Sequence, residues 1–137
     1  MSNYIIYTDG GSRGNPGPSG AGVCIMDQNK VVISEISEYL GVRTNNYAEY
    51  KSLYFALSKA LELGINQKKI EVFMDSKLVV EQINKRWKVK NNVLKIIYLE
   101  IMELLKFFSD ISISHVLRNL NTIADSLANK AMDLTLK

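Results

Sequence analysis

Near its N-terminus the chain reads Tyr4-Ile5-Ile6-Tyr7-Thr8-Asp9-Gly10-Gly11-Ser12-Arg13-Gly14-Asn15-Pro16-Gly17-Pro18-Ser19-Gly20-Ala21-Gly22. Residues 3–9 carry apolar side chains on both faces and read as a central β-strand that ends on the carboxylate of Asp9. The stretch after Asp9 holds both prolines and six of the eight glycines of the chain. Glycines let backbone N–H groups approach an anion closely. The stretch therefore predicts a loop for chemistry on phosphate, with a long turn between two strands as the alternative.

The composition is that of a globular domain. With 137 residues, 47% of them hydrophobic and 23% charged, the chain is expected to form one domain over residues 1–137. Its single cysteine, Cys24, excludes an internal disulfide and a multi-cysteine zinc site, and is expected to be buried. The net charge of +3 is too small to identify a polyanionic partner. No apolar run approaches the roughly 20 residues that span a bilayer, and Met1-Ser2-Asn3 does not begin a signal peptide. We expect a cytoplasmic monomer without membrane association.

Alternating and helical patterns divide the rest of the chain. Further strands are expected at 22–27, 31–40, 69–75 and 111–117, and helices are expected to begin at Tyr47, after Ser76, at Val93 and at Ile123. The short connection 28–30 predicts an antiparallel hairpin, and the helical crossovers predict parallel strands beside it. The result is an α/β fold with a mixed sheet. In such sheets ligands bind beyond the carboxyl ends of the parallel strands, where Asp9 and Asp75 are both expected.

Two local features accompany this pattern. The strongest helical stripe of the chain, which runs from Val93 to Phe108 and includes Ile96, is expected to be core. Residues 119–122, Asn-Leu-Asn-Thr, are expected to supply a turn and the cap of the last helix.

Four acidic residues could meet at this edge of the sheet: Asp9 and Asp75 at strand ends, Glu49 in the first turns of a helix, and Asp125 near the start of the last helix. Like charges about 4 Å apart repel by a few kcal/mol, so such a group favours bound cations. Oxygen ligands without a histidine or cysteine cluster select magnesium or manganese over zinc. Paired magnesium ions are typical of phosphodiester hydrolysis. Each acid taken alone could be a helix cap or a surface charge. The placement of all four together favours the catalytic interpretation.

Four motifs, in order along the chain, resemble those of the type 1 ribonuclease H family. They are Thr8-Asp9-Gly10-Gly11-Ser12-Arg13-Gly14-Asn15-Pro16-Gly17, Thr44-Asn45-Asn46-Tyr47-Ala48-Glu49-Tyr50, Asp75-Ser76 and Ala124-Asp125-Ser126-Leu127-Ala128. The resemblance implies the ribonuclease H-like fold, with a five-stranded sheet of order 3-2-1-4-5 in which strand 2 is antiparallel. It implies cutting of the RNA strand of RNA–DNA hybrids to leave a 5′-phosphate and a 3′-hydroxyl. By the same resemblance Asp9, Glu49, Asp75 and Asp125 are the catalytic carboxylates, which bind two Mg²⁺ ions, or Mn²⁺ in their place.

The resemblance also implies contacts with the nucleic acid. The backbone of Gly10, Gly11, Ser12 and Arg13 would lie along the RNA strand, which its 2′-hydroxyls distinguish from DNA. Asn15, Asn45 and Asn46 match positions that contact the hybrid, although Asn46 could instead cap the helix. Thr44 resembles a residue that holds a phosphate of the DNA strand.

The chain lacks the long basic protrusion of some bacterial members and resembles the compact subgroup. From this difference we expect either weaker affinity for the hybrid or a broader range of substrates that includes double-stranded RNA. Five basic residues and no acid lie between Gln82 and Leu99. Trp87, Lys88 and Lys90 from this segment could replace part of the lost phosphate contact, and a plain solvated surface is the alternative.

Two further residues lie near the last motif. His115, the only histidine, is expected inside the fifth strand, where a structural hydrogen bond is the preferred interpretation. The alternative is the role of the mobile histidine of many family members, which assists proton transfer or product release. Arg118 is the better candidate for a contact near the scissile phosphate, with a surface charge at a strand end as its alternative.

Three hypotheses follow for the function. The first is a magnesium-dependent endoribonuclease acting on RNA–DNA hybrids. The second is a catalytically weak module that binds hybrid or double-stranded RNA, and the third is a related metal-dependent nuclease on the same fold. A missing carboxylate would favour the second, and none is missing. Equal cutting of a DNA duplex would favour the third.

Overall fold

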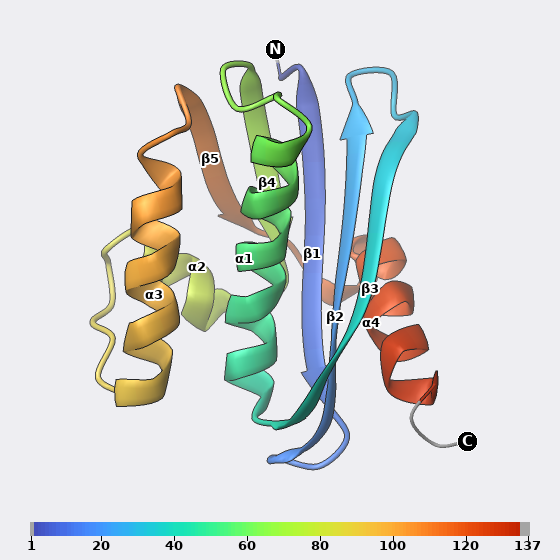
Figure 1. Cartoon of the computed structure of the whole chain (residues 1–137), viewed down its shortest axis with the longest axis vertical. Helices are drawn as coiled ribbons and strands as arrows, with labels where there is room; N and C mark the ends of the chain where they lie inside the picture. Colours follow the sequence, from blue (N-terminus) through green and yellow to red (C-terminus); the bar gives the residue numbers. More distant parts are fainter. Residues whose placement is uncertain (1, 135–137) are drawn as a thin grey trace.

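A five-stranded mixed sheet forms the centre of the protein, whose computed structural model describes residues 2–134 (Figure 1). The strands are β1 (Tyr4–Ser12), β2 (Gly17–Asp27), β3 (Val32–Arg43), β4 (Lys69–Met74) and β5 (Asp110–His115), in the spatial order β3-β2-β1-β4-β5. β2 runs antiparallel to both β1 and β3, whereas β4 and β5 run parallel with β1. The predicted fold class, sheet order and antiparallel second strand are confirmed.

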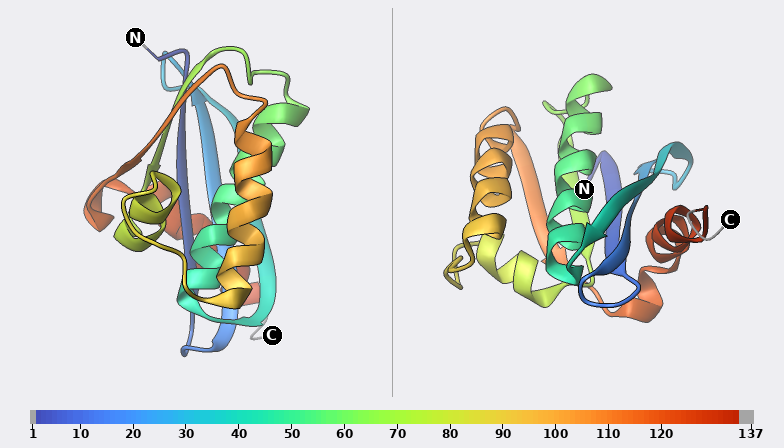
Figure 2. Two further views of the ribbon diagram at one scale, coloured as in Figure 1. Left: turned by 90° about the vertical axis from the view of Figure 1, so that its left-hand side faces the viewer. Right: turned by 60° about the horizontal axis from the view of Figure 1, so that its bottom comes forward.

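Helices cover both faces of this sheet. They are α1 (Asn45–Glu62), α2 (Lys77–Ile83), α3 (Asn92–Leu105) and α4 (Thr122–Asp133), with a short 3₁₀ turn at Arg118–Leu120 before α4. The two views of Figure 2 place α1 and α3 together on one face and α4 on the other. Within residues 2–134, no helix is both long enough and apolar enough to cross a bilayer.

The main hydrophobic core lies between the sheet and α1. Ile6 of β1 and Leu53 of α1 are fully buried in it, as is Ile101 of α3. The prediction that the whole stripe of α3 is core is wrong, because Val93 and Ile96 are 55% and 64% exposed. The reason is the place of α3 at one side of the molecule, where it packs chiefly on α1 and so buries only one of its sides. Cys24 is buried in β2, as predicted.

The glycine-rich stretch is mostly strand, which corrects the predicted loop. β1 continues three residues past Asp9, and β2 already begins at Gly17, so only residues 13–16 connect them. Here the glycines allow close helix packing. A Cβ atom on Gly22 would lie 2.2 Å from the carbonyl oxygen of Ala124 in α4. The absence of these side chains brings α4 directly onto the sheet.

The start of α1 corrects a second expectation. Thr44, and not Asn46, is the cap, because its hydroxyl oxygen accepts a hydrogen bond from the Tyr47 N–H at 3.2 Å. The alternative role of Asn46 as a cap is therefore wrong, and the Asn46 side chain lies at the surface instead.

Candidate active site

Three carboxylates from three different elements meet at one point. Asp9 lies in β1, Glu49 lies in the first turns of α1, and Asp75 directly follows β4. One carboxylate oxygen of each lies within 4.8 Å of the others. Parallel pairing of β1 with β4 ends at Thr8 and Met74, so the two aspartates come next on neighbouring strands.

Gly10 explains how the third carboxylate reaches this point. A Cβ atom on Gly10 would lie 2.2 Å from the carbonyl carbon of Ala48, so only glycine lets α1 approach β1 this closely. The Gly10 N–H donates to Glu49 Oε1 at 2.7 Å and to Asp9 Oδ1 at 2.9 Å. One backbone donor thus holds two carboxylates side by side.

Burial and mutual repulsion disfavour the ionised forms of these acids. Asp9 is 6% exposed and Glu49 is 9% exposed. Burial first, and then the charge of Asp75, raise the pKa of Asp9 from 3.8 to about 8. Burial, followed by the charge of Asp9, raises the pKa of Glu49 well above its usual value. A bound cation would reverse this balance and keep the carboxylates ionised.

The donor atoms suit a hard divalent cation. All three are carboxylate oxygens, which Mg²⁺ and Mn²⁺ prefer. Asp75 Oδ2 is buried and has no hydrogen-bond partner among residues 2–134, as expected of an oxygen that would coordinate an ion. Asp9, Glu49 and Asp75 therefore fit a metal site.

The fourth predicted acid, Asp125, stands slightly apart from this group. It lies half-buried in the first turn of α4, outside the compact cluster of three. Its carboxyl group is nevertheless close enough to hydrogen-bond Asp9 and to contribute to the raised pKa of Asp9. Asp125 also lines the same groove, so the structure brings all four acids to one edge of the sheet.

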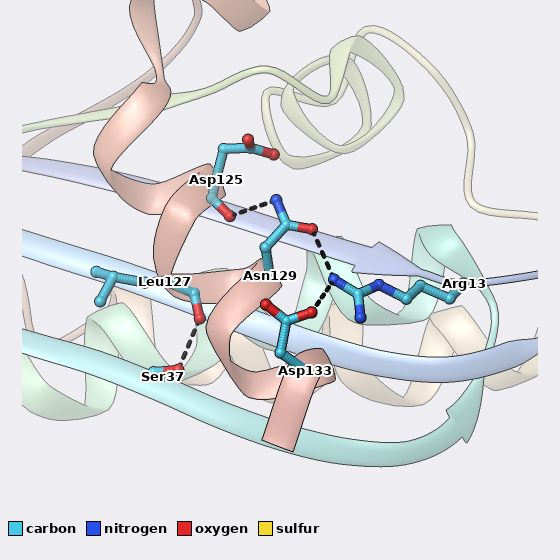
Figure 3. A network of polar contacts seen from close by, with 6 residues as sticks. All are labelled: Arg13, Ser37, Asp125, Leu127, Asn129 and Asp133. Carbon is cyan, nitrogen blue, oxygen red and sulfur yellow. Dashed lines mark hydrogen bonds and ion pairs between the residues drawn. The ribbon is translucent and has the colours of Figure 1, made fainter. Parts of the chain in front are cut away.

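Polar contacts lie along α4, both within the helix and between it and other elements (Figure 3). Asn129 donates to the backbone oxygen of Asp125 at 3.0 Å, and Ser37 of β3 donates to the backbone oxygen of Leu127 at 2.6 Å. Arg13 reaches α4 from the β1–β2 connection and pairs with Asp133 at 2.6 Å.

Arg13 Nη2 also donates to Asn129 Oδ1 at 3.4 Å. The sequence interpretation missed Asn129 and Asp133. Both could have been found from the sequence, because they follow Asp125 by four and eight residues and therefore lie on the same face of the last helix.

A groove of about 430 Å³ is lined by Asp9, Glu49 and Asp125 and by many of the predicted nucleic-acid contacts. Its lining includes Gly10, Gly11, Ser12, Arg13, Asn45, Asn46 and Arg118. Asn15 and Thr44 line a neighbouring hollow of about 390 Å³, which Asn46 shares. The Ser12 N–H donates to Asn45 Oδ1 at 2.8 Å, and the Asn45 N–H donates to Asn15 Oδ1 at 3.0 Å. These bonds set the orientation of both side-chain amides.

The basic segment lies outside the carboxylate groove. Trp87 and Lys88 line a separate hollow of about 400 Å³ together with Lys85 and Lys95. Lys90 is exposed in the same connector between α2 and α3. These residues are not brought to the carboxylates, and a contact with nucleic acid there would lie away from the reacting atoms.

His115 does not play the expected structural role. It is the last residue of β5, its side chain is exposed, and that side chain makes no hydrogen bond to any other part of the described chain. The His115 side chain is a minor contributor to the lowered pKa of Glu81, after the larger effect of the hydrogen bond from Arg86. The preferred sequence interpretation of His115 is therefore wrong.

Comparisons with known proteins identify the family of the chain. The sequence profile of the reverse transcriptase-like family matches residues 7–131. The structure of LC11-RNase H1, isolated from compost by a metagenomic approach, is 41% identical, with a TM-score of 0.93 over 100% of both chains. The structure of the same protein in complex with an RNA/DNA hybrid has a TM-score of 0.92 at 40% identity, over 98% of this chain and 99% of that one.

Two curated relatives are longer than this chain. The bifunctional protein Rv2228c of Mycobacterium tuberculosis is 45% identical over 130 residues, which are 94% of this chain and 35% of that protein. Ribonuclease HI of Halobacterium salinarum is 40% identical over 127 residues, which are 93% of this chain and 63% of that protein. The chain thus spans between about a third and two thirds of their length. The profile match over residues 7–131 and the likeness in sequence and structure to these relatives show that the chain belongs to the ribonuclease H family.

Proposed function

We propose that this chain is a metal-dependent endoribonuclease that hydrolyses the RNA strand of RNA–DNA hybrids. The observation that carries the proposal is the convergence of Asp9, Glu49 and Asp75 within 4.8 Å, beside a groove that Asp9, Glu49 and Asp125 line. A relative named ribonuclease HI, and a solved relative in complex with an RNA/DNA hybrid, support the choice of substrate. A module that only binds is less favoured, because all four expected acids are present.

In the proposed reaction, Asp9, Glu49, Asp75 and Asp125 hold two Mg²⁺ ions, and Mn²⁺ can replace them. When bound, such ions supply an activated water and stabilise the leaving oxygen, which leaves a 5′-phosphate and a 3′-hydroxyl. The Gly10 N–H keeps two of the carboxylates in place. Arg118 contributes positive charge at the wall of the groove, where it would pair with a phosphate of the cut strand.

The neighbouring surfaces would read the two strands. The backbone of Gly10 to Arg13, with Asn15, Asn45 and Asn46, would contact the RNA strand and its 2′-hydroxyls. Thr44 would hold a phosphate of the DNA strand from the adjacent hollow. Trp87, Lys88 and Lys90 would extend this contact along the DNA backbone, so binding should weaken as salt rises.

Three further expectations belong to this proposal. The compact basic segment gives a broader substrate range that includes double-stranded RNA. The protein acts as a monomer over one domain, residues 1–137. Its single cysteine suits the reducing cytoplasm, where we expect it to act.

A substrate panel tests the proposal. Labelled RNA–DNA hybrid, double-stranded RNA, single-stranded RNA and DNA duplex are each incubated with magnesium, manganese or chelator. We expect cutting of the hybrid RNA strand with either metal and none with chelator, and slower cutting of double-stranded RNA. Cutting in the presence of chelator, or equal cutting of the DNA duplex, would contradict the proposed activity.

A further inference from the structure

Asn121 is buried, although the residues on either side of it in the chain are exposed. It lies between the 3₁₀ turn and α4 and is 1% exposed, whereas Leu120 beside it is 63% exposed. The sequence pattern predicts a helix cap in this turn, yet the Asn121 side chain makes no capping bond to α4. Its Nδ2 instead donates to the backbone oxygen of Thr8 in β1 at 2.8 Å. The amide thus connects parts of the chain that are 113 residues apart.

The acceptor, the backbone oxygen of Thr8, lies directly before Asp9 in β1. Pairing of β1 with β4 extends as far as Thr8 and Met74 and stops one residue before Asp9 and Asp75. The Asn121 amide therefore contacts β1 where its pairing with β4 ends. This bond fixes the carbonyl group that directly precedes the first catalytic carboxylate.

The backbone of the same residue organises the start of α4. Its carbonyl oxygen accepts a hydrogen bond from the Asp125 N–H at 3.1 Å, and its N–H donates to the carbonyl oxygen of Arg118 at 3.0 Å. Through its side chain Asn121 holds the strand that carries Asp9, and through its backbone it holds the turn that carries Asp125. The other contacts of Figure 3 hold α4 further along its length.

We propose that Asn121 is a positioning residue that sets the separation between the Asp9 and Asp125 carboxylates. The inference rests on the proposed function, because it assigns a task to a residue beside the same site. Ligands of a metal site must be held to within about 0.5 Å, and Asp125 comes from a helix on the other face of the sheet from Glu49. A short, buried amide-to-carbonyl bond between the two elements supplies this constraint. Because Asn121 is buried and its amide donates to the backbone of β1, it would act through the elements that carry the carboxylates.

The test removes the donor and keeps the branched shape of the side chain. Asn121→Leu is compared with Asn66→Leu, because Asn66 Nδ2 donates to the Phe107 backbone oxygen at the same 2.8 Å, near the opposite end of the sheet. Asn121→Ser serves as a milder variant if the leucine variant does not fold. The measurements are the melting temperature, kcat and KM on hybrid, and Mn²⁺ affinity by electron paramagnetic resonance without substrate.

We expect Asn121→Leu to lower kcat and to weaken Mn²⁺ binding by about 10- to 100-fold each, the usual effect of losing a partner that orients metal ligands. KM for hybrid should stay within about threefold, and Asn66→Leu should change kcat and Mn²⁺ affinity by less than about threefold. A folded Asn121 variant with wild-type kcat and Mn²⁺ affinity would overturn the inference. Equal losses in the Asn66 variant would do the same.

The experiment distinguishes failure of the proposed function from failure of the inference about Asn121. If the wild-type protein does not cut hybrid, that function is wrong. The Mn²⁺ measurement, which needs no substrate, would still report whether Asn121 positions the carboxylates.

Discussion

The replacement Asp9→Asn should stabilise the protein when metal is absent. Asp9 lies within 4.8 Å of both Glu49 and Asp75. Two unit charges at that separation repel by about 3.5 kcal/mol at an effective dielectric constant of about 20. The amide of the variant carries no charge, and its oxygen can still accept the Gly10 N–H. Because part of the repulsion is already relieved by protonation, we expect a gain of about 2 kcal/mol at pH 8.5 in chelator.

The stability gained by Asp9→Asn should increase with pH. The pKa of Asp9 is raised from 3.8 to about 8, so the folded, metal-free protein binds a proton that the unfolded chain has already released. The contribution of Asp9 to wild-type stability is therefore fully present below about pH 4 and is lost as the pH rises through about 8. The advantage of Asp9→Asn should be small at pH 5.5 and large at pH 8.5.

The assay is urea unfolding in chelator at both pH values. The exposed Asp110, at the start of β5, provides the control Asp110→Asn, which should change stability by less than about 0.5 kcal/mol. The reasoning fails if Asp9→Asn is less stable than the wild type at pH 8.5, or if its advantage does not grow with pH. Saturating Mg²⁺ should abolish the difference or reverse it, because the ion binds only the intact site tightly.

Three other predictions concern packing, binding and reactivity. Gly22→Ala should cost about 3 kcal/mol in urea unfolding, because the new Cβ would lie 2.2 Å from the Ala124 carbonyl oxygen, and a loss below about 0.5 kcal/mol would contradict the close packing of α4. The double variant Lys88→Ala and Lys90→Ala should weaken hybrid binding and make it less dependent on salt, with kcat at saturation unchanged, and an unchanged salt slope in a binding titration would exclude the contact. Cys24 is buried and its pKa is raised to about 11, so a thiol reagent at pH 8 should label it only after unfolding, and rapid labelling of the native protein would contradict that burial.

Regular patterns made the sheet and two of its carboxylates predictable. Alternation predicted two parallel strands that reach Asp9 and Asp75, and this was enough to place the two aspartates together, because parallel strands run to the same edge. Glu49 and Asp125 lie on helices. The spacing of apolar residues predicts a helix, but it does not predict which strand a given turn of that helix packs against. Their place in the site came from the family resemblance.

Close packing and long-range contacts were not predictable in the same way. A glycine-rich stretch reads as a loop, because nothing local reveals that Gly22 faces a helix more than a hundred residues later. Asn121 reads as a cap for the same reason, since its partner Thr8 is distant in sequence. The exposed side of α3 depends on which elements cover it, and the sequence of one helix does not contain that information.

The central claim is that the four carboxylates perform the chemistry and the surrounding groove only binds. The most direct test measures single-turnover cutting of the RNA strand, with magnesium, by the wild type and by Asp9→Asn at matched occupancy of hybrid. Hybrid affinity is measured in parallel. We predict that the variant loses at least about 1,000-fold in rate while its affinity stays within about threefold. Retained cutting by Asp9→Asn, or a rate loss explained wholly by weaker binding, would contradict the account.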